Sequence, residues 1–177
     1  MGAWSVVLDA DRLLLMDSAD SHYKIKLSRM DRAISSLVYA QRRRFIGPPL
    51  RVLLWALGVE VPRQVEIGQR LTLGHPTSGL VIHPRTKIGD DVAIFHGVTV
   101  GRADSFQPEP AYKARVTIGN GVVIAAGATI LFKGGSDLFI GDDAVIGANS
   151  VITKSVPSGE VWAGNPARCI RSVRDDA

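Results

Sequence analysis

The sequence predicts an all-β protein, a left-handed parallel β-helix of hexapeptide repeats with a short α-helical N-terminal extension. Three observations predict this fold: aliphatic residues recur every six positions, glycine often follows them directly, and a small or β-branched residue comes four places after them. A helix repeats at about 3.6 residues and a strand at about 2, whereas short strands wound into stacked coils give a longer period. The aliphatic positions are Ile67, Leu73, Ile82, Ile88, Ile94, Val100, Ile118, Ile124, Ile130, Ile140, Ile146 and Ile152.

Each position of the repeat has an expected place in the coil. The aliphatic residue points inward to fill the core, and the smaller residue fits near a corner of the triangular section. A stack of such coils is stiff and has almost no concave surface of its own, so a functional site is expected on an outer face, where two copies meet. The corner positions are Thr86, Val92, Val98, Val122, Ala128, Ala144, Ser150 and Val156.

The repeat divides the chain into three segments. Residues 1–58 lack it and form the extension, with one helix expected over 31–45 and a second over 50–57, separated by Gly47-Pro48-Pro49. Residues 59–157 form the β-helix. Within it, 103–112 has two prolines and no aliphatic residue in phase, which predicts an outward loop, and 133–138 predicts a short bulging turn. Residues 158–177 form a tail that folds back on the coil.

Composition favours a cytoplasmic protein. The single cysteine, Cys169, has no partner for an internal disulfide, which favours a reducing compartment. The first residues lack the basic segment of a signal peptide, and no apolar run is long enough to cross a bilayer.

The formal net charge is +4, and basic residues gather early, at Arg42-Arg43-Arg44 and Arg51. A solvated helix face is the favoured interpretation, with nucleic-acid or membrane binding as the alternative. No aromatic residues interleave with the arginines as stacking platforms for bases, so we expect no nucleic-acid partner. The solvated helix face also leads us to expect no membrane contact.

The repeat also assigns positions to the histidines. His75 and His96 each come two places after an inward aliphatic residue, at the same turn of neighbouring coils. They should therefore project outward from one edge, one coil apart, although chance could also produce this pair. His83 and His22 show no such partner, and we interpret both as surface residues.

An outward histidine is a natural general base at neutral pH, because an imidazole titrates near about 6.5. A carboxylate normally fixes its tautomer and stabilises the imidazolium. Glu60, between apolar Val59 and Val61, is a candidate for this partner. A capping or solvated glutamate after Gly58 is an equally good interpretation of Glu60.

Three stretches carry a family resemblance. They are LGHPTSGLVIHPRTKIGDDVAIFHGVTVG (Leu73 to Gly101), IGNGVVIAAGATIL (Ile118 to Leu131) and VPSGEVWAGNPARCIR (Val156 to Arg171). The chain resembles the hexapeptide-repeat acyltransferases and, within them, the serine acetyltransferase group. The resemblance covers roughly residues 59–171 and implies acetyl-CoA as co-substrate, no metal, and a homotrimer with its sites between subunits.

The resemblance also implies roles for individual residues. His75 matches the catalytic base and Glu60 the acid that pairs with it, while His96 and Arg115 are candidates for binding the acceptor. A direct transfer follows, in which His75 deprotonates an acceptor hydroxyl and the alkoxide attacks acetyl-CoA; Cys169 is a poor nucleophile candidate. The resemblance implies two groups of CoA-binding residues. Small residues would line a groove for the pantetheine arm: Gly101, Ala126, Gly127 and Ala148. Lys154 and Arg168 would bind the CoA phosphates.

The chain departs from the serine acetyltransferases in ways that affect the acceptor. Gly74 stands where they have an acid that helps to hold the amino acid, and Ala114-Arg115 stand where they have an Arg-His pair. The C-terminus Asp175-Asp176-Ala177 lacks the isoleucine tail that docks into cysteine synthase, so no such complex is expected. The acceptor is therefore L-serine or a sugar hydroxyl, with the acetyltransferases of polysaccharide or nucleotide-sugar biosynthesis as the alternative.

Two further classes remain as rivals. A zinc hydratase resembling γ-class carbonic anhydrase would need three histidine ligands, and the histidines at 75, 83 and 96 lack that family's paired spacing of five residues. A non-catalytic scaffold coil would not need the outward loop or the CoA-like C-terminal segment.

Overall fold

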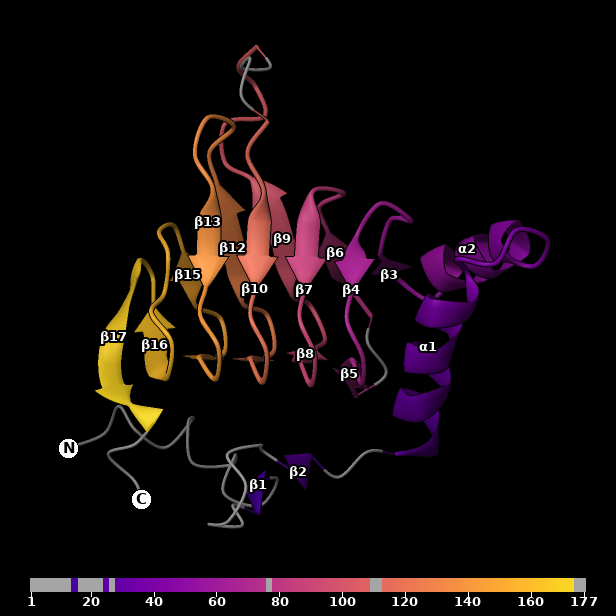
Figure 1. The fold of residues 1–177 in the computed structure, drawn as a ribbon, viewed down its shortest axis with the longest axis horizontal. Coiled ribbons are helices and arrows are strands. Elements are labelled where there is room, and N and C mark those ends of the chain that lie inside the picture. Colours follow the sequence, from indigo (N-terminus) through magenta and orange to yellow (C-terminus); the bar gives the residue numbers. More distant parts are fainter. Residues whose placement is uncertain (1–13, 16–23, 26–27, 76–77, 109–112, 174–177) are drawn as a thin grey trace.

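The computed structural model describes residues 14–15, 24–25, 28–75, 78–108 and 113–173. Two short helices lie at one end of a triangular prism, and an antiparallel hairpin closes the other end (Figure 1). A further two-stranded pair joins β1 (Leu14–Leu15) to β2 (Lys24–Ile25) in antiparallel register. Among the described residues, no helix has the length and apolar character needed to cross a bilayer.

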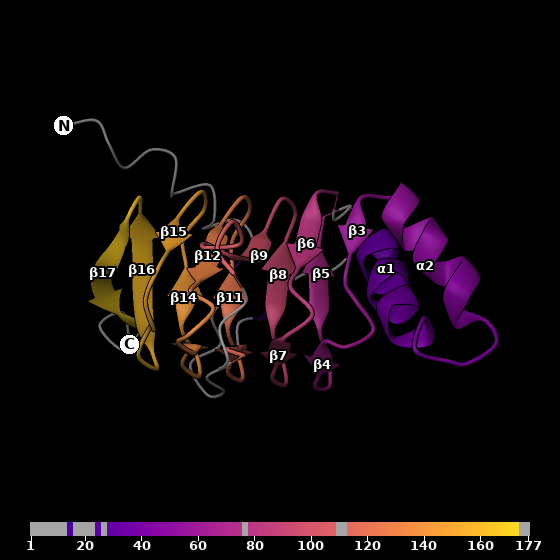
Figure 2. The ribbon, with the colours of Figure 1, turned by 90° about the horizontal axis from the view of Figure 1, so that it is seen from above.

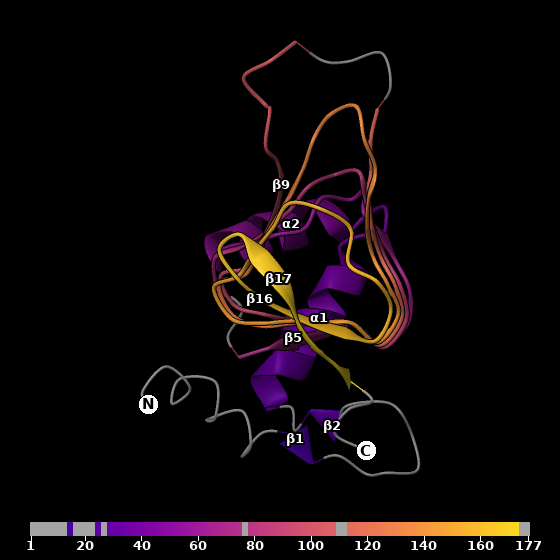
Figure 3. The same cartoon turned by 90° about the vertical axis from the view of Figure 1, so that its left-hand side faces the viewer.

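Three sheets form the faces of the prism, as seen along its axis in Figure 3, and their strands are parallel except for the last one, β17. The β6 sheet contains β3 (Val59–Glu60), β6 (Leu80–Ile82), β9 (Thr99–Arg102), β12 (Thr129–Phe132) and β15 (Val151–Ile152). The β7 sheet contains β4 (Glu66–Ile67), β7 (Thr86–Ile88), β10 (Val116–Ile118) and β13 (Leu138–Ile140). The β8 sheet contains β5 (Thr72–Gly74), β8 (Ala93–Phe95), β11 (Val123–Ile124), β14 (Val145–Ile146), β16 (Glu160–Gly164) and β17 (Ala167–Ser172).

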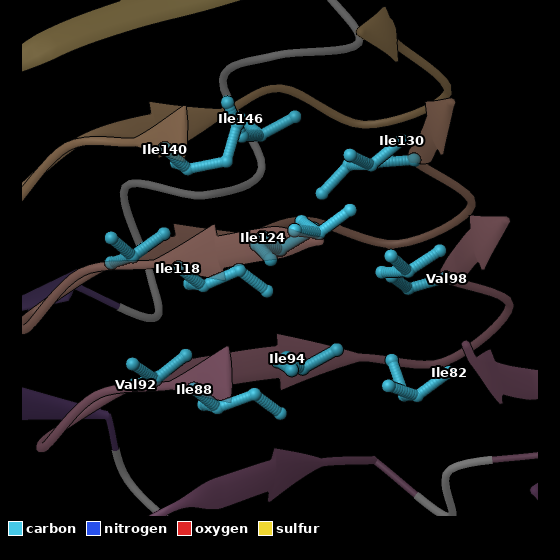
Figure 4. Close-up of a cluster of buried hydrophobic side chains, with 14 of the residues drawn as sticks. Ile82, Ile88, Val92, Ile94, Val98, Ile118, Ile124, Ile130, Ile140 and Ile146 are labelled. Atoms are coloured by element: carbon cyan, nitrogen blue, oxygen red, sulfur yellow. The ribbon is translucent and has the colours of Figure 1, made fainter. Parts of the chain in front are cut away.

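The aliphatic repeat becomes columns of stacked side chains inside the prism (Figure 4). Parallel pairing aligns Ile94, Ile124 and Ile146 in one column, and Ile88, Ile118 and Ile140 in another. All six are essentially inaccessible. Because fully burying such a side chain contributes about 1.5–3 kcal/mol, these columns are the main source of stability. The parallel β-helix that the repeat predicts is confirmed.

The corners need unusual backbone conformations. Where the β8 sheet turns into the β6 sheet, the chain has positive φ at Gly79, Gly97, Gly127 and Asn149, one above another. A Cβ atom on Gly97 would lie 3.5 Å from the Cα of Gly127, so this corner also stacks closely. We call it the histidine corner, because His75 and His96 begin two of its turns.

Helix α1 (Arg29–Ala40) covers the open end of the first coil. Ser28 and Asp31 form a capping box at its start. The helix and the turn after it then supply polar side chains to backbone groups at the edge of the prism: Ser35 Oγ accepts from the Leu73 N–H at 3.0 Å, and Gln41 Nε2 donates to the Val61 carbonyl at 3.0 Å. These bonds satisfy edge groups that would otherwise be open to pairing with another chain.

The second helix begins earlier than the sequence predicts. Helix α2 (Gly47–Ala56) has its prolines in the first turn, where their missing N–H groups are unpaired in any helix. Helix α1 correspondingly ends at Ala40, so Arg42, Arg43 and Arg44 lie in the connection and not in its last turn. The Gly-Pro-Pro segment therefore starts a helix instead of separating two.

The opposite end also differs from the expectation. Strand β16 pairs in parallel with β14, so the coil extends to Gly164, beyond the predicted boundary at 157. The chain folds back only with β17, which is antiparallel to β16. Trp162, buried on β16, covers the end of the core.

Candidate active site

His75 follows strand β5 directly and lies exposed at the histidine corner, in the left-handed region with φ of 57°. The preceding Gly74 pairs with Phe95 of strand β8. A Cβ atom on residue 74 would lie 2.8 Å from the Phe95 ring, so the ring fills the space in which a side chain at 74 would stand. Phe95 thus contacts the position that departs from the family pattern, and its ring centroid lies 5.9 Å from that of His75.

His96 stands at the same corner, one coil further along. Its ring centroid is 6.0 Å from that of His75, and the two rings meet edge to face at 81°. Both side chains are exposed. The phase of the repeat correctly predicts that these imidazoles project from one edge in adjacent coils. Phe95 is the neighbour that the sequence analysis missed; the pairing of a glycine with an aromatic residue in the next coil was the available signal.

Small residues continue the histidine corner beyond the two imidazoles. The Gly127 N–H donates to the His96 carbonyl at 2.9 Å, and the Asn149 N–H donates to the Ala126 carbonyl at 2.9 Å. This register sets Ala126 beside His96 and Ala148 beside Ala126. A Cβ atom on Gly127 would collide with the Asn149 side chain, which explains the glycine there. The corner therefore carries two imidazoles followed by a strip of minimal side chains.

Other predicted site residues lie elsewhere on the same chain. Gly101 lies on β9 and pairs with Leu131, near the corner where the β6 sheet turns into the β7 sheet. Arg115 is exposed at that same corner, where its N–H donates to Asp137 Oδ1 at 2.8 Å. Glu60 is exposed on β3, opposite Val81 of the neighbouring strand. Within one chain, the corner of Gly101 and Arg115 is not the histidine corner.

Two predicted cations lie toward the end of the prism that the hairpin closes. The Lys154 ammonium is 5.1 Å from the centre of the Trp162 ring, a distance typical of a cation–π contact. Arg168 is exposed on β17 and pairs with Ala163, the residue after Trp162. The hairpin therefore brings Lys154 and Arg168 to the same end of the coil.

The outward loop after β9 is held by hydrogen bonds from Arg102, a residue that the sequence does not indicate as important. The Arg102 side chain is only 8% exposed and donates from Nε to Asp104 Oδ1 at 2.7 Å. Its Nη2 also donates to the Asp104 carbonyl at 3.1 Å, and the Gly134 N–H donates to the Asp104 carboxylate. Figures 1 and 3 show that the described part of this segment, residues 103–108, projects from the prism as predicted; residues 109–112 lie outside the described residues.

These bonds lower the pKa of Asp104, first through Arg102 and then through the Gly134 N–H. A carboxyl group with a lowered folded-state pKa contributes stability above its ordinary pKa. That contribution is lost only as the pH falls through the lowered value. The loop anchor therefore persists across neutral and mildly acidic pH.

Removing the guanidinium should loosen the loop. We expect Arg102→Ala to increase the rate of chymotrypsin cleavage after Phe106, which is 82% exposed, because the bonds from residue 102 to the loop are lost. Arg115→Ala, at the far end of the loop, is the matched control and should leave that rate near the wild-type value. Equal cleavage rates in the wild type and Arg102→Ala would show that the loop holds its conformation without this anchor.

His83 is not the isolated surface residue that the sequence suggests. Its ring packs edge-on against Phe132 with centroids 4.9 Å apart, and its Nδ1 accepts from the Arg85 N–H at 3.2 Å. It therefore shapes the turn after β6. His22 lies outside the described residues. Among the residues that the structure describes, no group of three or more His, Cys, Asp or Glu side chains could hold a metal ion.

No protein-family model matches the chain. A serine acetyltransferase of Helicobacter pylori is 36% identical over 142 residues, which are 80% of this chain and 78% of that protein. One of Mycobacterium tuberculosis is 39% identical over 113 residues, 64% of this chain and 45% of that protein.

Solved structures give the same family. The serine acetyltransferase of Brucella abortus strain S19 in complex with coenzyme A has a TM-score of 0.59 at 30% identity, over 81% of this chain and 54% of that one. The soybean serine acetyltransferase apoenzyme has a TM-score of 0.59 at 31% identity, over 80% of this chain and 55% of that one. This chain spans about half the length of these solved enzymes. It belongs to the serine acetyltransferase family and is an acetyl-CoA-dependent O-acetyltransferase of the hexapeptide-repeat class.

Proposed function

We propose that this chain transfers an acetyl group from acetyl-CoA to the hydroxyl of a small acceptor, L-serine or a sugar, by direct attack with His75 as general base. The observation that carries the proposal is the histidine corner: an exposed imidazole, a second imidazole one coil away, and a strip of alanine and glycine beside them. The relatives supply the reaction class, since they are named serine acetyltransferases.

In the proposed reaction His75 takes the proton from the acceptor hydroxyl, and the resulting alkoxide attacks the thioester carbonyl. A backbone N–H near Gly101 stabilises the oxyanion of the tetrahedral intermediate. The intermediate collapses by breaking the carbon–sulfur bond, and the CoA thiolate leaves and takes up the proton from the imidazolium. Glu60 is proposed to hold the imidazole, and His96 and Arg115 to orient the acceptor. No covalent intermediate with the enzyme forms.

The strip of small residues is proposed as the groove for the pantetheine arm of CoA. Ala126, Gly127 and Ala148 follow the histidines along the corner and leave room beside them. Lys154 and Arg168, gathered at the hairpin end, supply cations for the CoA phosphates. One relative, from Brucella abortus, was solved in complex with coenzyme A, which supports this assignment.

We propose that the active site forms between subunits of a homotrimer. Gly101 and Arg115 lie at a different corner of the prism from His75, so they can meet His75 when a neighbouring copy brings that corner to it. The anchored loop beside them carries Phe106, which is 82% exposed, and we place this side chain at the contact with the neighbouring copy.

The side chains around His75 bear on the choice between the two candidate acceptors, L-serine and a sugar. Serine acetyltransferases have an acid at the position of Gly74, and here the Phe95 ring occupies the space beside it. A carboxylate there would pair with the ammonium group of an amino acid, whereas an aromatic and imidazole rim suits a neutral, hydroxyl-rich molecule. This observation favours a sugar hydroxyl as the second candidate acceptor. A relative from Neisseria gonorrhoeae was solved in complex with serine, so L-serine stays the first candidate acceptor.

An acceptor panel tests the proposal. Purified protein and acetyl-CoA are combined with L-serine, simple sugars or nucleotide sugars, and the free thiol of released CoA is measured. We expect acceptor-dependent thiol release with one of these classes, and none from a matched panel of the deoxy analogues that lack the reacting hydroxyl. Thiol release at the same rate with and without every acceptor would contradict the proposed O-acetyl transfer.

A further inference from the structure

Helix α2 is apolar on nearly all sides, yet most of it is uncovered. Its sequence GPPLRVLLWA has one charged residue, Arg51, and only Gly47 and Leu54 are buried, where the helix packs on α1 and β3. A helix that is apolar all round is normally enclosed. Its exposed face contains large apolar side chains of the helix and of the residues that flank it, and their exposed fractions are 45–88%. This α2 face consists of Phe45 88%, Ile46 46%, Val52 67%, Leu53 46%, Trp55 72% and Leu57 45%.

Positive charge surrounds the α2 face. Arg43, Arg44 and Arg51 are exposed, and the Arg44 guanidinium lies 5.9 Å from the centre of the Phe45 ring. Residues 29–58 contain six arginines and one carboxylate, Asp31, which is buried in the α1 cap. The whole chain has a formal net charge of only +4, so the excess positive charge is concentrated at this end of the molecule.

The position of α2 leaves this face open to a flat surface. It is the outermost element at its end of the prism, as the two perpendicular views show (Figures 1 and 2). A helix of ten residues is about 15 Å long, half the thickness of a bilayer core. It can therefore lie along a membrane surface but cannot span it.

The chemistry of the face selects among possible partners. Two copies related by a two-fold axis would bring the same arginines together. The six arginines of residues 29–58 outnumber the nearby exposed carboxylates, which are Glu60 on β3 and Glu66 on β4, so such a pair of faces would keep an excess of positive charge. Nucleic acid would neutralise the positive charge of the arginines but would leave the aliphatic side chains in contact with water. An anionic bilayer satisfies both, because arginine attracts its headgroups while tryptophan, phenylalanine and leucine enter the interface.

We propose that the α2 face binds the surface of an anionic lipid bilayer, with α2 lying along the interface. The sequence alone favours a solvated helix for these arginines; the exposed apolar face beside them is what the structure adds. This proposal is independent of the acceptor and of the catalytic residues. The test is sedimentation of the full chain with vesicles of phosphatidylglycerol and phosphatidylcholine, compared with vesicles of phosphatidylcholine alone.

We expect binding to the anionic vesicles, little binding to the neutral ones, and release by high salt. Each arginine near such a surface changes partitioning by roughly fivefold, so Arg43→Gln with Arg44→Gln should lower it by roughly thirtyfold. The double variant Val52→Ser with Trp55→Ser should also abolish binding. Phe139→Ser, at a 51% exposed apolar residue of the coil, and Arg63→Gln, at an exposed arginine outside the face, are the matched controls and should bind normally.

All variants should keep the wild-type melting temperature and the wild-type rate of acetyl transfer in solution, which separates this test from that of the proposed function. Wild-type protein that stays in the supernatant with anionic vesicles would overturn the proposal, as would binding that the α2 variants do not weaken. A change in oligomeric state on Val52→Ser with Trp55→Ser, without vesicle binding by the wild type, would instead assign the face to a second copy.

Discussion

Replacing His75 by alanine should lower kcat for acetyl transfer by about 10²- to 10⁴-fold, the range that a positioned general base contributes. The imidazole is exposed at the histidine corner beside the strip of small residues proposed for the pantetheine arm. Without it, the acceptor hydroxyl has no group at this position to take its proton. The KM for acetyl-CoA should change little, because the cofactor contacts proposed here lie on other residues. Thiol release under saturating acetyl-CoA measures the effect.

The neighbouring imidazole provides the matched control. His96 lies 6.0 Å from His75 between ring centroids and shares its exposure and its corner. In the proposed mechanism it orients the acceptor, so His96→Ala should mainly raise the acceptor KM. If His75→Ala keeps most of its turnover while His96→Ala loses it, the two assignments are exchanged. If both variants keep their turnover, the general base is neither imidazole.

The second large effect is on stability and concerns the middle of the core. Ile124→Ala should reduce the free energy of unfolding by about 2–5 kcal/mol, since it removes a buried aliphatic side chain and leaves a cavity. Ile124 is fully buried between Ile94 and Ile146 in its column (Figure 4). The rigid stacking of the coils gives the cavity few ways to collapse. Urea unfolding followed by circular dichroism measures the change.

Two controls separate cavity formation from a general loss of strand propensity. Ile124→Val removes one methyl group from the same site and should reduce the free energy of unfolding by about 0.5–1.5 kcal/mol. Val81→Ala changes an aliphatic residue of strand β6 that is 38% exposed, and its effect should be small. An equal loss in Ile124→Ala and Val81→Ala would mean that the columns do not dominate the stability.

The repeat predicts most of the coil because each six-residue unit is local and nearly self-sufficient. The aliphatic positions other than half-buried Ile67 are fully enclosed, and so are the small corner positions. The same periodicity aligns His75 with His96, since any two residues at one phase of adjacent coils must lie one above the other. Positions that depend only on the period were therefore predicted well.

The sequence does not predict the roles of residues that depend on particular neighbours in the fold. The periodic pattern shows Gly74 and Phe95 as separate positions, whereas the coil register sets the ring against the glycine. Arg102 reads as an ordinary polar residue at a loop entrance until its bonds to Asp104 and its low exposure are seen. From the sequence, the prolines at the start of α2 indicate a break, because a Gly-Pro-Pro segment equally suits a turn and a first helical turn.

The order of the residues thus dictates the coil, its inward columns and the stacking of the two histidines, because short-range periodicity decides which way each side chain points. The folded chain alone decides how the ends are closed, which side chain fills the space beside His75, and which apolar face of α2 stays uncovered. Those features arise from contacts between segments far apart in the sequence, as when Ser35 and Gln41 of the extension reach the first coil. Exposure is a property of the whole packed chain, which no local pattern contains.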